Sequence, residues 1–158
     1  MRDEDREAFD AFVRARLPEL LRFGRALTGS PEAAADLVQD ALERTVLAWP
    51  RLRSREEPEG YVRRIMVNRN ISIWRKFGRE HVTAEVVDSA AEDTHFDTDL
   101  WRALRQLPPK QRAVIALRYY EDMSEADIAR TLGCSVGTVK SQASKGLAKM
   151  RLLMPDDR

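Results

Sequence analysis

The sequence predicts an all-α fold of two small helical domains that are joined by a flexible acidic linker. Apolar residues recur at three- and four-residue spacing along most of the chain, as they do on the buried face of a helix. Residues 81–97 lack this spacing, and they contain five acidic residues but no lysine or arginine. We therefore predict one domain over residues 1–80, a linker over 81–97 and a second domain over 98–158.

Composition excludes several classes of protein. The chain is 43% hydrophobic and 34% charged, a balance typical of globular domains. It has no apolar run of membrane-spanning length, and its N-terminus lacks the basic-then-apolar order of a secretory signal. The one cysteine, Cys134, cannot form an internal disulfide, and no Cys/His cluster has metal-ligand spacing. We therefore expect a cytoplasmic protein with no membrane insertion, metal or cofactor.

The first two helices are predicted from their apolar stripes and their end residues. The first stripe contains Phe9, Phe12, Val13, Leu17, Leu20, Leu21, Gly24 and Leu27. Pro18 should kink or break this helix, because proline lacks an N–H donor and its ring clashes with the preceding turn. Gly29 can end the helix. Ser30 and Pro31 suit the N-cap and first position of a second helix, which Pro50 should end.

A third helix is predicted from about Glu59 to about Gly78, after a loop over residues 50–58. The second domain begins with a further apolar stripe, and the two prolines at 108 and 109 should interrupt its first helices. This stripe contains Leu100, Trp101, Leu104 and Leu107.

Two blocks of basic residues lie on either side of the linker. Residues 60–79 hold six basic residues and no acid, and residues 136–151 hold four and no acid. This distribution is typical of a protein that contacts a polyanion at two places. For either block alone, a solvated helix face is an equal alternative.

The most specific local pattern lies in residues 125–151, where a short helix, a glycine and a second helix follow one another. Ala129 is small where the helices must cross, Gly133 permits a tight turn, and Ser135 can cap the second helix. This spacing is typical of a helix-turn-helix. Side chains that can reach base edges and phosphates occupy the exposed side of the second helix: Thr138, Lys140, Ser141, Gln142, Ser144 and Lys145.

A plain pair of packed helices would explain the same spacing. However, the second helix carries no acidic residue, whereas four acids precede it, and this asymmetry favours DNA recognition. Cys134 lies in the turn, where a small buried side chain is the simplest role for it.

The two other predicted helices of the first domain also carry polar patterns. Four polar residues share the face opposite the buried stripe of the second helix: Asp36, Gln39, Asp40 and Glu43. Such a face is usually only solvated. The third helix interleaves Tyr61, Trp74 and Phe77 with arginines and asparagines, a combination that suits single-stranded nucleic acid. An amphipathic helix with aromatic core residues is the alternative.

Four motifs occur in order along the chain. They are DLVQDAL at 36–42, YVRRIMVNRNISIWR at 61–75, LRQLPPKQRAVIALRYYEDMSEADIA at 104–129 and GCSVGTVKSQASKGLAKMR at 133–151. Together they closely resemble the extracytoplasmic-function (ECF) group of the sigma-70 family, the promoter-recognition subunits of bacterial RNA polymerase. The resemblance covers about residues 9–80 and 98–153. It implies that the two domains are sigma domain two and sigma domain four.

The resemblance also implies partners for the polar patterns. The face with Asp36, Gln39, Asp40 and Glu43 would dock on the coiled coil in the largest subunit of core RNA polymerase, and the helices over 104–120 would meet the polymerase flap. The second helix of the helix-turn-helix would read the promoter −35 element. An anti-sigma factor is a usual further partner in this group.

The residues that match the part of the family that reads and opens the −10 element are Arg63, Arg64, Asn68, Arg69 and Asn70. Asn68 matches a position of the pocket that captures an unpaired base, and an amide suits this task because it both donates and accepts hydrogen bonds. The −35 helix departs from the family pattern. Lys140, Gln142 and Lys145 stand where relatives often have arginine, which leaves the exact −35 sequence open.

Three other function classes compete with this interpretation. A stand-alone helix-turn-helix regulator would bind duplex DNA by itself, whereas a sigma factor needs core polymerase, and the first half of the chain is elaborate for a dimerisation arm. An enzyme is disfavoured, because the sequence offers no Gly-rich phosphate loop, no Ser/His/Asp set and no metal cluster. A bare protein-interaction module leaves both basic blocks unexplained.

Overall fold

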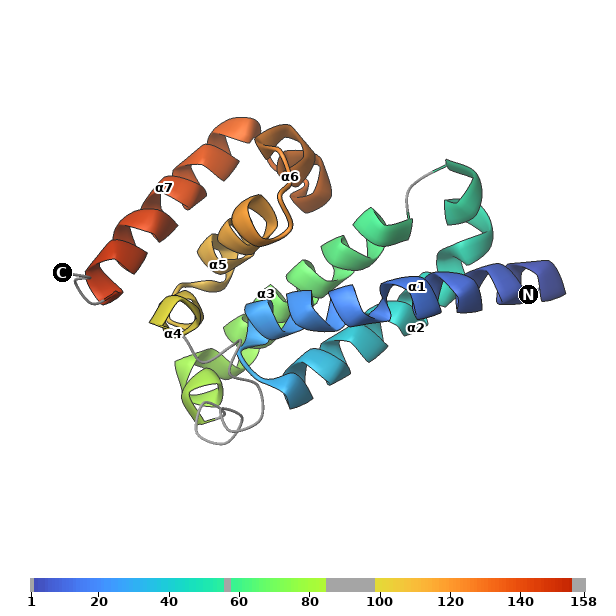
Figure 1. Ribbon diagram of the computed structural model, residues 1–158, viewed down its shortest axis with the longest axis horizontal. Helices are drawn as coiled ribbons and strands as arrows, with labels where there is room; N and C mark the ends of the chain where they lie inside the picture. The colour runs from blue at the N-terminus through green and yellow to red at the C-terminus, as the bar shows by residue number, and fades with distance from the viewer. Residues whose placement is uncertain (1, 56–57, 85–98, 155–158) are drawn as a thin grey trace.

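The computed structural model describes residues 2–55, 58–84 and 99–154, and these residues form helices and short connections without a β-strand (Figure 1). The predicted all-α fold is confirmed. The elements are α1 (Asp3–Thr28), α2 (Pro31–Arg55), α3 (Pro58–Ala84), α4 (Asp99–Arg105), α5 (Pro109–Ile115), the π-helical turn η2 (Ala116–Tyr120), α6 (Glu125–Leu132) and α7 (Val136–Leu153). We call α1–α3 the N-terminal unit and α4–α7 the C-terminal unit.

The N-terminal unit is held together by an apolar core among its three long helices. Leu20 and Phe23 of α1, Val38 of α2, and Val62 and Met66 of α3 are all buried in this core. Figure 1 shows α1 and α2 running side by side, with α3 packed across both. The predicted stripes of α1 and α2 therefore face one another as expected from their spacing.

Pro50 does not end α2 as predicted, and Pro18, predicted to kink or break α1, does not break it. Helix α1 continues through Pro18, and α2 continues through Pro50 to Arg55, so part of the predicted loop over 50–58 is helical. A proline inside a helix removes one backbone hydrogen bond. Buried side chains on both sides of Pro50 offset this loss: Trp49 packs against Phe9 with a ring-centroid distance of 5.3 Å, and Leu52 is 1% exposed.

The turn between α1 and α2 has the predicted caps. Gly29 adopts φ 85°, a left-handed conformation that favours glycine, and its N–H donates to the carbonyl of Arg25. A Cβ atom on Gly29 would lie 2.5 Å from Cδ of Arg105 in the C-terminal unit, so a side chain here would be strained by the backbone conformation and would also have to displace Arg105. Oγ of Ser30 accepts a hydrogen bond from the N–H of Ala33 at 3.1 Å.

Helix α3 is longer than predicted and extends past Gly78 to Ala84, so the first four residues of the predicted linker continue this helix. The rest of the predicted linker lies outside the described residues. The C-terminal unit is interrupted after α4, as the two prolines at 108 and 109 predict, and α5 begins at Pro109. Val114, Ile128 and Val139 are buried between α5, α6 and α7.

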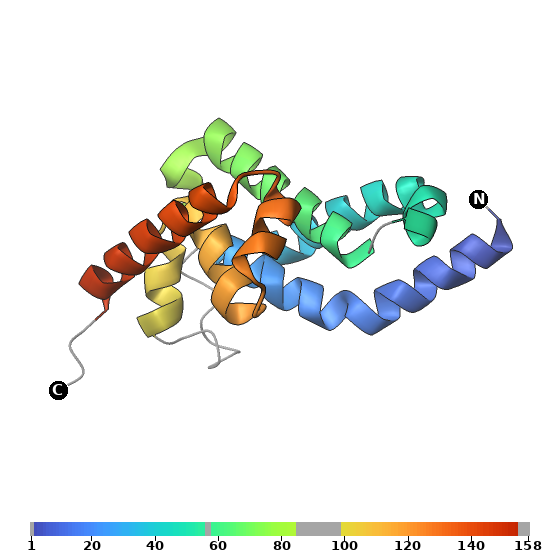
Figure 2. The same ribbon diagram turned by 90° about the horizontal axis from the view of Figure 1, so that it is seen from above.

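The two units pack directly against each other. Their buried apolar residues form one continuous cluster, in which Leu27, Met66 and Val67 join Leu104, Leu107 and Val114. Helix α3 contacts α5 and α6, and the end of α1 contacts α4 and α5. Both views show the C-terminal unit lying along one end of the N-terminal unit (Figures 1 and 2).

Candidate nucleic-acid and polymerase interfaces

The helix-turn-helix is formed by α6 and α7, as predicted. Ser124 caps α6 by accepting from the N–H of Asp127 at 3.1 Å, and Ser135 caps α7 by accepting from the N–H of Thr138 at 3.0 Å. Gly133 between them has φ 71°. The turn residues predicted from the sequence therefore produce the predicted crossing of two helices.

The face of α7 divides into a buried and a polar side. Val139, Ala143 and Met150 are buried against the rest of the C-terminal unit. Of the residues predicted to read DNA, five are exposed and Gln142 is half-buried; the five are Thr138, Lys140, Ser141, Ser144 and Lys145. Helix α7 is thus amphipathic, with its basic and hydroxyl side chains directed away from the core.

The residues predicted to read the −10 element lie along α3 in three different environments. Asn68 and Arg69 are exposed. Asn70 is half-buried, and its Nδ2 donates to the carbonyl of Leu27 at 3.3 Å. Asn70 thus supports the end of α1 in this structure.

Arg63 and Arg64 contact the C-terminal unit. Nη2 of Arg63 lies 2.5 Å from Oε1 of Glu121, and Nη1 lies 2.9 Å from Oε2 of Glu59. Nε of Arg64 donates to the carbonyl of Thr131 at 2.9 Å, and Nη2 donates to the carbonyl of Arg130 at 3.4 Å. Both acceptors of Arg64 lie in the last turn of α6, directly before the helix-turn-helix glycine.

A groove of about 510 Å³ separates α3 from the helix-turn-helix. Asn68, Ser72 and Arg75 line it from α3, and Cys134 and Gln142 line it from the opposite side. The structure therefore brings a predicted −10 residue and predicted −35 residues to two walls of one groove.

The acidic face of α2 is largely open. Asp36, Gln39 and Glu43 are exposed, as predicted for a docking face. Asp40 differs from them: it is half-buried, with Oδ2 3.4 Å from Nε of Arg69 and 3.6 Å from Nε of Arg44. Asp40 thus connects α2 to α3 inside the N-terminal unit.

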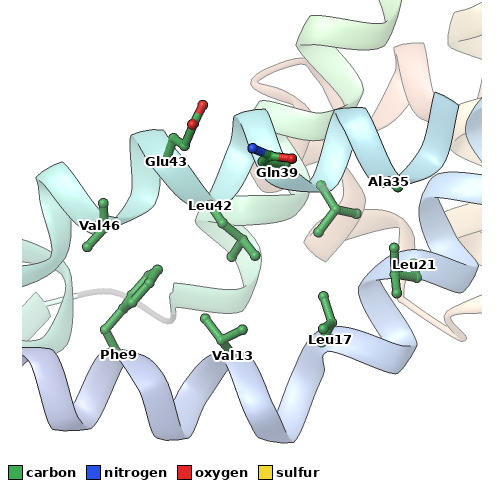
Figure 3. Close-up of a pocket in the computed structure, with 10 residues that line it drawn as sticks. Phe9, Val13, Leu17, Leu21, Ala35, Gln39, Leu42, Glu43 and Val46 are labelled. Carbon is green, nitrogen blue, oxygen red and sulfur yellow. The ribbon is translucent and has the colours of Figure 1, made fainter. Parts of the chain in front are cut away.

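An apolar groove runs beside this acidic face, between α1 and α2, with a volume of about 460 Å³ (Figure 3). Phe9, Val13 and Leu17 project into it from α1, opposite Leu42 and Val46 of α2. Gln39 and Glu43 lie at its edge. One turn further along α2, Leu47 is 86% exposed. Polar and apolar contact surfaces are therefore adjacent on α2.

Two residues at the boundary between the units were not predicted from the sequence. Arg112 is 1% exposed, and its guanidinium donates to the carbonyls of Leu27, Leu107 and Arg105, the last two at 2.8 and 2.9 Å. Burial, with a smaller contribution from Arg105, lowers the pKa of Arg112 to about 10, so it stays charged at neutral pH. Glu121 is the partner of Arg63. No sequence periodicity reveals such contacts, because most of the acceptors are backbone carbonyls.

Among the side chains that the structure describes, no group of three or more His, Cys, Asp or Glu residues could hold a metal ion. No helix in the described part of the chain is long and apolar enough to span a membrane.

Comparison with known proteins places both units in one family. Residues 12–80 match the family Sigma-70 region 2, and residues 97–150 match Sigma-70, region 4. The chain is 38% identical over 148 residues to an RNA polymerase sigma-E factor of Streptomyces avermitilis, a match that covers 90% of this chain and 83% of that protein. It is 32% identical over 155 residues to the ECF RNA polymerase sigma factor SigM of Mycobacterium tuberculosis, covering 95% of this chain and 79% of that protein.

A solved structure has a similar fold over most of the chain. The sigma factor RpoE of Bartonella quintana, in a co-crystal structure with the anti-sigma factor NepR, superposes with a TM-score of 0.71 at 29% identity, covering 96% of this chain and 99% of that one. The family matches and the relatives named here together account for nearly all of the sequence. The chain therefore belongs to the extracytoplasmic-function group of the sigma-70 family of RNA polymerase sigma factors.

Proposed function

We propose that this sigma factor directs core RNA polymerase to promoters by reading the −35 element with α7 and by reading and melting the −10 element with α3. The observation that carries the proposal is the paired occurrence of two basic helices, each in the unit where the family match predicts a DNA-reading segment. In this role the chain is a binding subunit in the cytoplasm, where the polymerase works, and the polymerase supplies the chemistry.

On α7, the proposed −35 contacts are Thr138, Lys140, Ser141, Gln142, Ser144 and Lys145. Their support is that they share the polar side of a helix-turn-helix second helix whose other side is buried. Lysine can contact a phosphate or a guanine as a single cation, without the two-point geometry of arginine. We expect the lysines to contribute more affinity than sequence discrimination.

On α3, the proposed −10 contacts are Arg63, Arg64, Asn68, Arg69 and Asn70. The exposed amide of Asn68 lies beside arginines and is free of a hydrogen bond to the described residues, so it suits capture of an unstacked base. Arg63 and Arg64 can take part only after they leave their present partners in the C-terminal unit.

We propose that core polymerase binds the outer face of α2 through Asp36, Gln39 and Glu43, with Asp40 holding α2 against α3. The apolar groove between α1 and α2 lies beside this face and offers apolar area that a coiled coil of complementary charge could bury. On the same family basis, the helices over 104–120 would contact the polymerase flap.

We also propose an anti-sigma factor as a regulatory partner. The support is the likeness to RpoE of Bartonella quintana, whose structure was determined with its anti-sigma factor. The overall arrangement of both units is similar in the two chains, so a partner could recognise them in a similar arrangement.

The experiment that tests the proposed function separates it from a stand-alone helix-turn-helix regulator. The purified chain is mixed with core RNA polymerase, and the complex is isolated by size exclusion and tested for binding to promoter fragments. We expect co-elution and promoter binding only by the complex. Tight and specific duplex binding by the chain alone, with no co-elution, would instead support the regulator.

A further inference from the structure

An apolar lining runs through the groove between α3 and the helix-turn-helix. Helix α3 lies beside α5 and α6, and these helices form the groove together with the turn that follows α6 (Figures 1 and 2). Val67 and Val114 are buried beneath the groove, and Ile71 and Leu132 are half-buried along it. None of the described residues that line the groove is aromatic. The groove therefore offers aliphatic surface and no ring on which a nucleobase could stack.

Polar side chains surround this aliphatic surface, and the charged ones are all cations. Arg75 of α3 and Lys110 of α5 are exposed, and neither side chain has an ion-pair or hydrogen-bond partner among the described residues. The side chains of Asn68, Ser72 and Gln142 are also without a hydrogen bond to the described residues. No acidic residue in the described part of the chain lines the groove. An anion that enters would therefore meet two cations and several donors without a carboxylate to repel it.

The combination of features distinguishes this groove from an ordinary solvated surface. Exposed lysines and arginines are common and need no ligand, but here two of them, from different helices, border an aliphatic groove. The groove volume of about 510 Å³ lies within the range of roughly 300–1,000 Å³ that is typical of small-molecule sites. A bare phosphate would leave the aliphatic surface in water, and a neutral alkane would leave both cations unpaired. The lining as a whole therefore matches a small molecule with an alkyl body and an anionic head.

We propose that this groove is a binding site for a small aliphatic carboxylate. In this arrangement the alkyl chain lies along Ile71 and Leu132, and the carboxylate pairs with Arg75 and Lys110. The guanidinium group presents parallel N–H donors that fit the two oxygens of a carboxylate. Neither cation is among the proposed promoter contacts, so the site goes beyond the proposed function and does not depend on it.

The native chain carries its own reporter of occupancy, because Cys134 is its one cysteine and lines the groove in a half-buried position. The full chain is treated with N-ethylmaleimide, an uncharged thiol reagent, and the rate of modification is measured by mass at increasing concentrations of octanoate. At twice the Kd the rate should fall about threefold, because about one third of the sites remain empty. Isothermal titration calorimetry measures the Kd independently, and the two values should agree.

Related small molecules separate the contributions of the alkyl chain and the anionic head. Octanoate should bind at least about threefold more tightly than hexanoate, because two further methylene groups are buried. Acetate has the head without the chain, and 1-octanol has the chain without the charge, so each should bind at least about tenfold more weakly than octanoate. Inorganic phosphate and adenosine monophosphate test whether the groove takes a bare anion or a nucleotide. Both should bind more weakly than octanoate.

Substitutions at the two exposed cations test the head site without changing the apolar lining. Arg75→Gln and Lys110→Gln should each weaken octanoate binding at least about threefold, and Arg75→Lys should lose less affinity than Arg75→Gln because it keeps the charge. The matched control is Lys76→Gln, which removes the neighbouring exposed cation of α3 from a position that does not line the groove. It should bind octanoate with the parental affinity. Helical content and urea unfolding of each variant show whether the fold is kept.

Saturable protection of Cys134 by octanoate that requires both the alkyl chain and the two cations would support the site. A parent chain without saturable octanoate binding would overturn it. Tighter binding of phosphate or adenosine monophosphate, equal binding of acetate or 1-octanol, or equal affinity of the Arg75→Gln, Lys110→Gln and Lys76→Gln chains would overturn it as well. Failure of the chain to bind core polymerase would instead count against the proposed function alone.

Discussion

Asp40 of α2 and Arg69 of α3 form an ion pair, with Oδ2 of the aspartate 3.4 Å from Nε of the arginine. Asp40 belongs to the predicted polymerase face, and Arg69 belongs to the predicted −10 face. The pair therefore joins the two proposed interfaces at the partly exposed boundary between α2 and α3. A substitution at Asp40 would disturb both helices, which makes it a poor test of polymerase docking.

Asp36 and Glu43 test polymerase docking more cleanly, because both are exposed. Asp36→Lys/Glu43→Lys should weaken binding to core polymerase by at least about tenfold, since it reverses the charge that a partner surface meets. Binding is measured by titration of labelled chain with core polymerase. Glu4→Lys/Glu7→Lys, with the same charge change on exposed residues of α1, should bind normally. Equal affinity of all three chains would reject the docking face.

Lys140 and Lys145 test the −35 helix. In the holoenzyme, loss of a base contact should cost about 1–3 kcal/mol and change the preferred −35 sequence, whereas loss of a phosphate contact should weaken all sequences and flatten the salt dependence. Each alanine variant is measured on a set of −35 sequences at several salt concentrations. If neither sequence preference nor salt dependence changes in either variant, another surface reads the DNA.

Asn68 tests recognition of the −10 element. Asn68→Ala should leave core binding intact but reduce open-complex formation, because the pocket contact to an unstacked base is lost. Permanganate footprinting on duplex and premelted promoters measures the effect. A premelted bubble should rescue the variant only in part, since the base contact is still absent. Opening of the duplex promoter at the wild-type level would remove Asn68 from the proposed pocket.

The pH dependence of stability tests the environment of Glu121. Burial is the largest cause that raises its pKa above 4.5, Arg63 opposes this shift, and Glu59 and Glu19 add to it. A carboxyl group with a raised pKa in the folded chain binds protons more tightly there than in the unfolded chain. As the pH falls from neutral toward 4.5, more of the Glu121 carboxyl is protonated in the folded chain. The contribution of Glu121 to the free energy of unfolding therefore becomes more favourable.

The comparison with Glu121→Gln isolates this effect, because all other groups titrate in both chains. The free energy of unfolding by urea is measured at several pH values. Wild type should gain stability relative to Glu121→Gln as the pH decreases. A relative gain as the pH increases would mean that the ion pair with Arg63 outweighs the cost of burial.

Gly29 tests the junction of the two units. Gly29→Ala should lower the free energy of unfolding by about 1–2 kcal/mol or more, because φ is left-handed and the new Cβ would meet the side chain of Arg105. Gly60→Ala is the matched control, since among the described residues no atom beyond its chain neighbours and its own helix backbone lies within 4 Å of its Cβ position. It should leave stability unchanged or raise it by up to about 1 kcal/mol. Equal loss in both variants would contradict the account of the turn.

Local sequence patterns predicted the caps and turns well. Gly29, Ser30, Gly133 and Ser135 act as expected, because capping depends on residues close in the chain. Pro50 was wrongly predicted to end α2. Its effect depends on tertiary burial of Trp49 and Leu52, which local patterns do not report.

In the candidate site, too, features set by local sequence were predicted, whereas tertiary contacts were not. Exposure of the polar residues on α2 and α7 follows from helical periodicity and could be predicted. The hydrogen bonds that Arg64 donates to α6 could not be predicted, because their acceptors are backbone carbonyls 66 and 67 residues away in the chain. A basic residue on a predicted nucleic-acid helix and a basic residue that caps a distant helix look identical in the sequence.

Transcription by the reconstituted holoenzyme tests the central claim most directly. Core RNA polymerase is incubated with a library of genomic promoter fragments, with and without the chain, and the 5′ ends of the transcripts are mapped. The account predicts discrete new start sites that share −35 and −10 elements and that are reduced by Asp36→Lys/Glu43→Lys. A set of transcripts identical to that of core polymerase alone, under conditions in which another sigma factor is active, would contradict it.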